Sequence, residues 1–211
     1  KPKSIRTALT VSLSSPDKMA EEALDYGKCD LLKLKLGSEN VLESIAAVRQ
    51  VAPKAKIIID ANEAWSEEQL RSWQEQLLEM SIDLVEQPLP SDQDNCLGNF
   101  QHLVPICADE SCHTTEDIER LVGLYDYVNL KLDKTGGLTE ALNCKNMAKE
   151  RGLGLMIGCM VSTSLSMAPA LLLTEDVDFI DLDGPFLLAK DRDPSLIGSS
   201  SELIYDSDVW G

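Results

Sequence analysis

The chain has 211 residues, of which 44% are hydrophobic and 26% are charged, and its formal net charge at pH 7 is −17. This length is enough to bury a sizeable core and favours a single domain over residues 1–211. The acidic balance argues against binding to nucleic acid or to an anionic membrane surface, because phosphate groups attract basic patches. We therefore expect a small-molecule partner, and we leave open whether the chain forms a homo-oligomer.

The six cysteines are scattered without the closely spaced Cys or Cys/His pairs of zinc sites. A chain of this length does not need a disulfide framework to fold. The sequence contains no signal peptide and no apolar run long enough to span a bilayer. These features predict a cytoplasmic protein with reduced thiols.

Short apolar runs alternate with amphipathic segments along the chain. Strands are expected at residues 7–13, 30–37, 56–62, 83–89, 105–111, 127–132, 154–159 and 179–185. Apolar residues at three-and-four spacing predict helices over residues 15–26, 38–51, 66–80, 114–124 and 137–152. Ser15 before Pro16 is typical of a helix start, as is Ser66 with Gln69. Residues 198–208 are interpreted as a tail.

Regular alternation of strands and helices implies parallel strands joined by right-handed crossovers. About eight such units predict an α/β fold of the TIM-like (β/α)8 barrel type, slightly smaller than usual. The alternative is an open doubly wound sheet. That fold usually carries a glycine-rich phosphate turn after its first strand, and the segment "VSLSSPDK" has none.

The stretch "LLKLKLG", residues 31–37, places two lysines in a run that is otherwise built for burial. Successive side chains of a strand point to opposite faces, so Lys33 and Lys35 share one face and the leucines line the other. One interpretation is that both lysines face solvent on an edge strand, where charge prevents aggregation. The second strand of a closed barrel has no edge, and the leucine face also argues against that interpretation.

Polar side chains gather at the C-terminal ends of the predicted strands, where a barrel has its active site. They are Asp60, Asn62, Glu86, Asp109, Lys131, Asp181 and Asp183. Any one of these carboxylates could be a helix cap or part of a surface turn. Asp60, Glu86 and Asp109 come from three consecutive strands, however, and an all-oxygen set without histidine or thiolate favours Mg²⁺ over zinc.

The paired lysines suggest a base. A neighbouring ammonium and a divalent cation both disfavour the charged form of a lysine, so the pKa of Lys35 is expected to fall, with Lys33 helping to lower it. Lys131 adds a second amine on the sixth predicted strand, opposite the second strand in an eight-stranded ring. Two bases flanking one carbon are the arrangement of a racemase or epimerase. The plainer interpretation of Lys131 is a barrel lysine paired with Asp109 or Asp133.

These residues resemble the enolase superfamily, muconate-lactonizing subgroup, and within it the dipeptide epimerases. The resemblance extends over the whole chain. It is carried by the motifs "KLKLG", "IDAN", "VEQP", "ADES", "NLKLDKTGGL" and "DLDGP". The resemblance implies the modified (β/α)7β form of the barrel. It also implies a Mg²⁺ cofactor, because enzymes of this superfamily combine a lysine or histidine base with Mg²⁺.

Carried over residue by residue, the resemblance makes Asp60, Glu86 and Asp109 the Mg²⁺ ligands. Asn62 would support these ligands without binding the metal itself. Members of the family also carry an N-terminal α+β capping domain that closes the site. This chain starts at the first barrel strand, so we expect it to be the C-terminal barrel domain alone, without the capping domain.

The resemblance also assigns the proton-transfer groups. Lys35 and Lys131 would be the acid/base pair and Lys33 an electrostatic aid. Asp181 and Asp183 match the Asp-x-Asp motif that holds the α-ammonium group of a dipeptide, and as alternate strand residues they would share one face.

One position departs from the family pattern. Related epimerases often have a glutamate after "GSM" at the seventh strand, whereas "IGCMVSTS" offers Ser162 for the substrate's side-chain pocket.

The expected function is therefore that of a Mg²⁺-dependent isomerase: epimerisation of a dipeptide by two-lysine 1,1-proton transfer through a metal-stabilised enolate. The alternatives are another enzyme of the subgroup, namely an N-acylamino acid racemase, an o-succinylbenzoate synthase or a cycloisomerase, and a metal-binding barrel that turns nothing over without its lid. Asp181 and Asp183 argue against the other enzymes, because their substrates lack the ammonium group.

Overall fold

The structure is a computed structural model that describes residues 4–210. Its eight-stranded sheet follows chain order from β2 to β9, and neighbouring strands pair in parallel from β2 through β6 and between β8 and β9. The strands are β2 Leu9–Val11, β3 Leu31–Lys35, β4 Lys56–Asp60, β5 Leu84–Glu86, β6 Ile106–Ala108, β7 Tyr127–Leu130, β8 Gly154–Gly158 and β9 Phe179–Asp181. Every predicted strand is present, and the predicted TIM-like order is confirmed.

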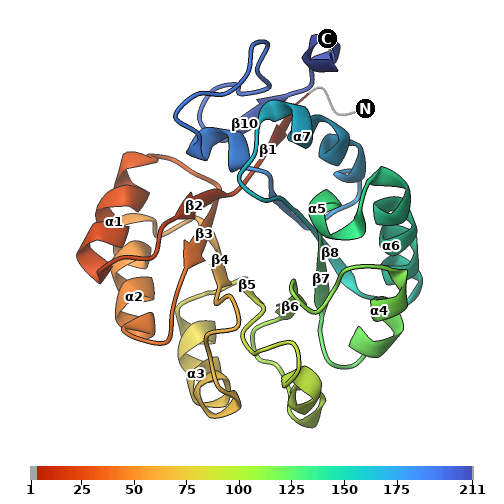
Figure 1. The fold of residues 1–211 in the computed structure, drawn as a ribbon. Coiled ribbons are helices and arrows are strands. Elements are labelled where there is room, and N and C mark those ends of the chain that lie inside the picture. The colour runs from red at the N-terminus through yellow and green to blue at the C-terminus, as the bar shows by residue number, and fades with distance from the viewer. Residues whose placement is uncertain (1–3, 211) are drawn as a thin grey trace. The chain divides into compact units, whose positions relative to one another are not determined.

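Helices separate most of these strands (Figure 1). The α-helices are α1 Pro16–Asp25, α2 Val41–Val51, α3 Glu67–Glu79, α4 Thr115–Leu121, α5 Leu132–Thr135, α6 Leu138–Glu150 and α7 Ser164–Ala170. The 3₁₀ helices are η1 Asp94–Asn99, η2 Leu171–Leu173, η3 Gly184–Leu187 and η4 Ser207–Trp210. In the described part of the chain the only helices that follow β9 are 3₁₀ helices, as the (β/α)7β form predicts. No helix of the described chain is long and apolar enough to cross a membrane.

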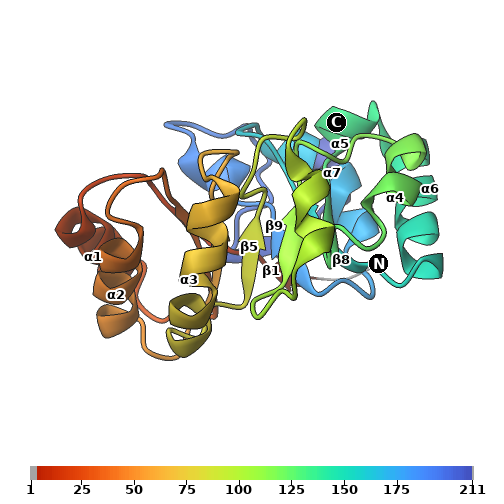
Figure 2. The same cartoon turned by 90° about the horizontal axis from the view of Figure 1, so that it is seen from below.

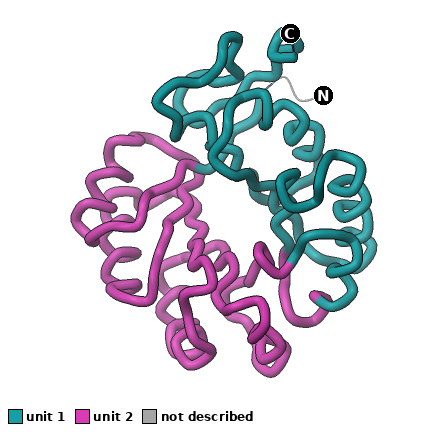
Figure 3. The backbone as a smooth tube through the Cα atoms, viewed as in Figure 1, with its two compact units in different colours: residues 1–8, 112–120, 128–211 teal, residues 9–111, 121–127 magenta. Residues whose placement is uncertain are grey.

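Two compact units make up the described chain (Figure 3). One unit comprises residues 9–111 and 121–127, and it holds β2 to β6 with α1, α2 and α3 along their outer side (Figures 1 and 2). Leu34 and Ile59 are fully buried in this unit, on the strand faces opposite Lys35 and Asp60. The predicted division between an apolar and a polar strand face therefore holds here.

The other unit comprises residues 1–8, 112–120 and 128–211 and holds β8, β9, α6 and α7. Gly158 at the end of β8 is required by packing, because a Cβ there would lie 2.6 Å from Oδ1 of the buried Asn129. Helix α7 was not predicted. Its short, largely apolar sequence includes Pro169 and lacks the polar face that marks an amphipathic helix.

The interpretation of residues 198–208 as a tail is wrong. They contain β10 Glu202–Ile204, which pairs antiparallel with β1 Ser4–Arg6. The backbone N–H of Thr7 also donates to the carbonyl oxygen of Ser201, 2.9 Å away. Two residues of this segment are buried, Ser201 and Leu203, and the apolar Leu203 anchors it.

Helix α3 begins as its sequence predicts. The Ser66 hydroxyl accepts from the backbone N–H of Gln69, and the Gln69 side chain accepts from the backbone N–H of Ser66. This capping box satisfies two backbone donors that a helix start leaves open. Ser15 occupies the equivalent position of α1 without a side-chain cap, although Pro16 starts that helix as predicted.

Candidate active site

Lys33 lies between two carboxylates. Its Nζ is 2.9 Å from Asp60 Oδ2 and 2.8 Å from Glu86 Oε2, and the lysine side chain is only 3% exposed. The edge-strand interpretation is therefore wrong, since β3 pairs with both β2 and β4 and Lys33 is shielded from solvent. The repulsion between the two lysines is offset by buried negative charge that comes from the next two strands.

Strand register explains why these groups meet. Lys35 pairs with Asp60 between β3 and β4, and Asp60 pairs with Glu86 between β4 and β5. Parallel strands in this register present their last residues at one level, side by side. Lys33 lies two residues earlier on the same face, so its long side chain extends along the strand to reach both carboxylates.

Asp60 is the centre of the charge cluster and is fully buried. Its Oδ2 also lies 2.6 Å from Lys35 Nζ. Burial by itself would raise the pKa of Asp60, but the charges and hydrogen bonds of Lys33 and Lys35 outweigh burial and hold that pKa below its ordinary value. The Asp60 carboxylate is therefore ionised at neutral pH, as a ligand for a cation must be.

Asn62 connects Lys35 to a residue that the sequence analysis missed. Lys35 Nζ donates to Asn62 Oδ1 at 2.9 Å, and Asn62 Nδ2 donates to Glu110 Oε1 at 3.2 Å. Burial, followed by the charge of Asp109, raises the pKa of Glu110. Asn62 thus supports the exposed lysine in this structure. The position of Glu110 directly after Asp109 in "ADES" was the available signal for it.

Asp109 follows β6 and is buried, with 2% of its surface exposed. Its backbone N–H donates to the side-chain Oε1 of Gln87, 2.8 Å away. Gln87 follows Glu86 directly and is fully buried. The three carboxylates predicted as metal ligands therefore belong to one unit of the structure, at the ends of β4, β5 and β6.

Lys131 lies one residue beyond β7, and it is buried with 6% of its surface exposed. Its backbone is extended (φ −122°, ψ 131°), but a helix starts at the next residue. The predicted strand over residues 127–132 is therefore too long at its C-terminal end. Asp133 lies in α5 and not in the strand.

Asp181 and Asp183 are buried at the end of β9, with 3% and 4% exposure. The backbone N–H between them, that of Leu182, donates to the Thr7 hydroxyl at 2.6 Å. Strand β9 ends at Asp181, and Asp183 lies beyond it with φ −84° and ψ 3°. That the two aspartates share one face stays a prediction.

Ser162 lies close to this strand end. A Cβ on Gly184 would be 2.8 Å from the carbonyl oxygen of Met160 and 3.1 Å from the backbone nitrogen of Ser162. Only glycine permits this approach of the two segments. The structure therefore brings Ser162 beside the segment that carries Asp183, within one unit.

The donor chemistry of Asp60, Glu86 and Asp109 fits Mg²⁺, since all three are carboxylates and the first two are buried neighbours across a strand pair. As they stand, no three His, Cys, Asp or Glu side chains within residues 4–210 are arranged to hold a metal ion. The Lys33 ammonium lies between Asp60 and Glu86. A metal ion would have to share these carboxylates with that ammonium.

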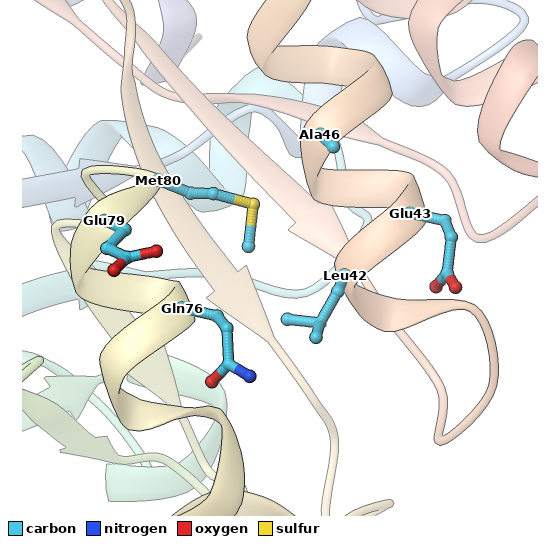
Figure 4. Close-up of a pocket in the computed structure, with 6 residues that line it drawn as sticks. All are labelled: Leu42, Glu43, Ala46, Gln76, Glu79 and Met80. Atoms are coloured by element: carbon cyan, nitrogen blue, oxygen red, sulfur yellow. The ribbon is translucent and has the colours of Figure 1, made fainter.

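Two hollows in this unit can be compared. One, of about 370 Å³, is lined by Lys35 and Asn62 together with Thr10, Leu36 and Ala61, at the ends of β2, β3 and β4. The other, also of about 370 Å³, lies between α2 and α3, where Leu42, Gln76 and Met80 point toward one another (Figure 4). Only the first contains predicted site residues.

Known proteins resemble nearly the whole of this chain. It is 46% identical over 204 residues to an L-Ala-D/L-Glu epimerase of Escherichia coli (strain K12), covering 96% of the chain and 64% of that protein. It is 42% identical over 205 residues to an N-acetyl-D-glutamate racemase of a Pseudoalteromonas species, covering 97% and 65%. The chain therefore spans slightly less than two thirds of the length of these relatives.

Solved structures agree with the fold. An enolase family member from Agrobacterium tumefaciens with homology to dipeptide epimerases, with bound sodium and L-Ala-L-Glu, matches with a TM-score of 0.96 and 46% identity, over 100% of this chain and 65% of that one. A dipeptide epimerase from Cytophaga hutchinsonii, complexed with Mg and D-Ala-L-Val, matches with a TM-score of 0.83 and 31% identity, over 90% and 55%.

The family model described as "Enolase C-terminal domain-like" matches residues 17–184, which include the predicted lysines and carboxylates of the strand ends up to Asp183. The resemblance to the enolase superfamily and its dipeptide epimerases is thereby confirmed. This chain belongs to the enolase C-terminal domain-like family.

Proposed function

We propose that this chain epimerises a dipeptide at an α-carbon next to a carboxylate, with Mg²⁺ as its cofactor. The observation that carries the proposal is the cluster of Lys33, Lys35, Asp60 and Glu86 at the strand ends, in a chain 46% identical to an L-Ala-D/L-Glu epimerase. Two carboxylates and a lysine at one strand level, with a second lysine reaching them from below, can hold a metal ion and move a proton.

Lys35 suits the role of base better than Lys33. Its side chain is 35% exposed and contributes to the hollow at the ends of β2, β3 and β4, so a substrate can reach its amine. Lys33 is enclosed between carboxylates and acts through its charge. A lysine that accepts a proton must first lose one, and the Asp60 carboxylate and Asn62 amide keep the Lys35 amine in a fixed position for both states.

Asp60, Glu86 and Asp109 would hold the Mg²⁺ ion. When bound, Mg²⁺ would supply a divalent charge that stabilises the negative charge developing on a substrate carboxylate as its α-carbon loses a proton. Lys131 is proposed as the second acid/base, returning a proton to the face of that carbon opposite to the one that Lys35 serves. Asp181 and Asp183 are proposed to bind the α-ammonium group, and Ser162 to contact the substrate's side chain.

A second candidate is racemisation of an N-acylated amino acid. It is favoured by the 42% identity to an N-acetyl-D-glutamate racemase. An N-acyl substrate has no ammonium group for the carboxylates of Asp181 and Asp183 to bind, whereas a dipeptide offers one. For this reason we favour the dipeptide.

Isotope exchange tests the proposal and separates the candidates. The chain is incubated in D₂O with Mg²⁺ and, in turn, L-Ala-L-Glu, a library of other dipeptides and N-acetylglutamate. We expect deuterium at one α-carbon together with inversion for a dipeptide, measured by ¹H NMR and chiral chromatography. Exchange with N-acetylglutamate alone would establish the second candidate. No exchange with any substrate would favour a barrel that binds metal without turnover.

Single lysine variants test the two-base step. We expect Lys35→Ala and Lys131→Ala each to abolish inversion, while each variant still exchanges the α-proton of one stereoisomer, and the two variants prefer opposite isomers. Lys18→Ala, which changes an exposed lysine of α1, is the control and should behave as wild type. The same isomer preference in both variants would refute two bases and leave the metal proposal intact.

A further inference from the structure

Gln87 occupies the point where β5 leaves the sheet. Its backbone N–H still donates to the carbonyl oxygen of Cys107 on β6, at 2.8 Å, but its φ of 35° turns the chain away immediately afterwards. A left-handed conformation of this kind is unusual for a residue other than glycine and has to be held by its surroundings. The carbonyl oxygen of Gln87 accepts from the backbone N–H of Glu63 at 2.8 Å, and the next N–H of β6's segment, that of Asp109, has a different acceptor.

The side chain of Gln87 is that acceptor. Its Oε1 accepts from the backbone N–H of Asp109 at 2.8 Å and from that of Ser111 at 3.1 Å. Backbone N–H groups can only donate, so the amide oxygen must face them and the amide nitrogen must face the other way. Gln87 thus bridges two residues that are proposed metal ligands: Glu86, which precedes it, and Asp109, whose backbone it holds.

The amide nitrogen of Gln87 is also held by hydrogen bonds. Nε2 lies 2.9 Å from each of three acceptors: the carbonyl oxygen of Leu89, Ser111 Oγ and Tyr125 OH. Ser111 Oγ and Tyr125 OH in turn donate to one oxygen of Asp94, at 2.7 and 3.2 Å. All members of this network are buried. A fully satisfied buried network fixes one arrangement of its side chains.

We propose that Gln87 is a positioning residue for the metal site, which sets the distance between Glu86 and Asp109 by hydrogen bonding to the Asp109 backbone. The inference rests on the proposed function, since it takes these two carboxylates as ligands. Gln87 does not touch metal or substrate itself. Groups that orient metal ligands from outside typically alter metal affinity 10–100-fold when they are replaced.

Gln74 offers a matched control within the same unit. It is also a buried glutamine, and its Oε1 also accepts from two backbone N–H groups, those of Leu103 at 2.8 Å and Val104 at 3.3 Å. It lies in α3 and contacts no predicted site residue by hydrogen bond. Replacement of either glutamine by methionine removes a side-chain acceptor of two backbone N–H groups from the same unit, and Gln87→Met also removes the hydrogen bonds of Nε2.

The test compares Mn²⁺ binding by wild type, Gln87→Met and Gln74→Met, measured by electron paramagnetic resonance of the free ion, with thermal melting of each metal-free protein. Both variants should melt earlier, but only Gln87→Met should bind Mn²⁺ more weakly, by about tenfold or more. Gln87→Asn, whose amide is one methylene too short to reach Asp109, should also weaken binding and serves if Gln87→Met does not fold.

Three results would overturn the inference. Wild-type affinity in Gln87→Met or Gln87→Asn would do so while leaving the proposed function intact. An equal loss of affinity in Gln74→Met would make the effect a general consequence of lower stability. Failure of the wild-type chain to bind Mn²⁺ would overturn both the inference and the proposed metal site.

Discussion

Lys33 shows how a residue that looks unfavourable in sequence can be required in the fold. Its ammonium group pairs with two buried carboxylates, Asp60 and Glu86, that come from two neighbouring strands. Neither carboxylate could be left alone in the interior without a large desolvation cost. The lysine is thus part of the structure of the site before any metal or substrate binds.

Removal of this ammonium should destabilise the protein strongly. Lys33→Met keeps the length of the side chain but leaves two buried carboxylates facing one another near Lys35, so we expect a loss of about 3–5 kcal/mol in the free energy of unfolding. Urea denaturation at pH 7 measures it. Lys18→Met on the exposed face of α1 should change stability by less than about 0.5 kcal/mol. A loss below about 1 kcal/mol in Lys33→Met would mean that the carboxylates find other partners.

Among the elements, hydrogen bonds from polar side chains connect loops to the starts of strands. His102, in the loop after η1, lies with Nδ1 2.7 Å from Asp126 Oδ2, and the same oxygen accepts from the backbone N–H of Ile106 at the start of β6. Burial opposes the charged form of His102 and of Asp126. Their mutual attraction nevertheless raises the pKa of His102 and lowers the pKa of Asp126.

This pair predicts a pH-dependent contribution to stability. A histidine whose pKa is raised in the folded state contributes its full stabilisation below the pKa of the unfolded state, about 6.5. This stabilisation is lost as the pH rises through the pKa of the folded state. An aspartate whose pKa is lowered in the folded state contributes its full stabilisation above the pKa of the unfolded state, about 3.9. This stabilisation is lost as the pH falls through the pKa of the folded state. The coupling energy of His102 and Asp126 should therefore be largest between roughly pH 4 and pH 6.5.

A double-mutant cycle checks this expectation. It uses His102→Gln, Asp126→Asn and the double variant, each unfolded in urea at pH 5.5 and at pH 9. We expect a coupling energy that is clearly larger at pH 5.5. Equal coupling at both values would show that the hydrogen bond contributes the same energy whether or not the ring is charged.

For the whole molecule, the two ends of the described chain form one small antiparallel sheet, β1 with β10. Leu203 in β10 is fully buried, whereas its neighbour Ile204 is 45% exposed. The last residues therefore contribute to the core through alternate positions of a strand, as a half-buried strand requires.

Alanine substitutions at these two positions should differ sharply. Leu203→Ala creates a cavity in a packed region and should cost about 2–5 kcal/mol. Ile204→Ala, on the exposed face of the same strand, should cost clearly less. Thermal or urea unfolding of both variants measures the difference. Two near-neutral substitutions would show that the burial of Leu203 does not stabilise the fold.

The sequence by itself determined the order of the eight barrel strands and of most helices between them, because the alternation of strand-like and helical periods is a local property. It also located the charged residues of the site, since side-chain parity within one strand placed Lys33 and Lys35 on one face and the leucines on the other. The identity of the strand-end residues was enough to indicate the family. These inferences depend only on neighbours within a few positions of the chain.

Only the tertiary structure decided which of these groups touch. Parity within β3 could not reveal that Lys33 lies between Asp60 and Glu86, because that contact depends on the register between three strands. The role of Gln87 toward Asp109 and the pairing of β10 with β1 were hidden for the same reason. Hydrogen bonds and ion pairs between distant segments form only where the fold brings those segments together. A local sequence pattern does not specify which segments become neighbours.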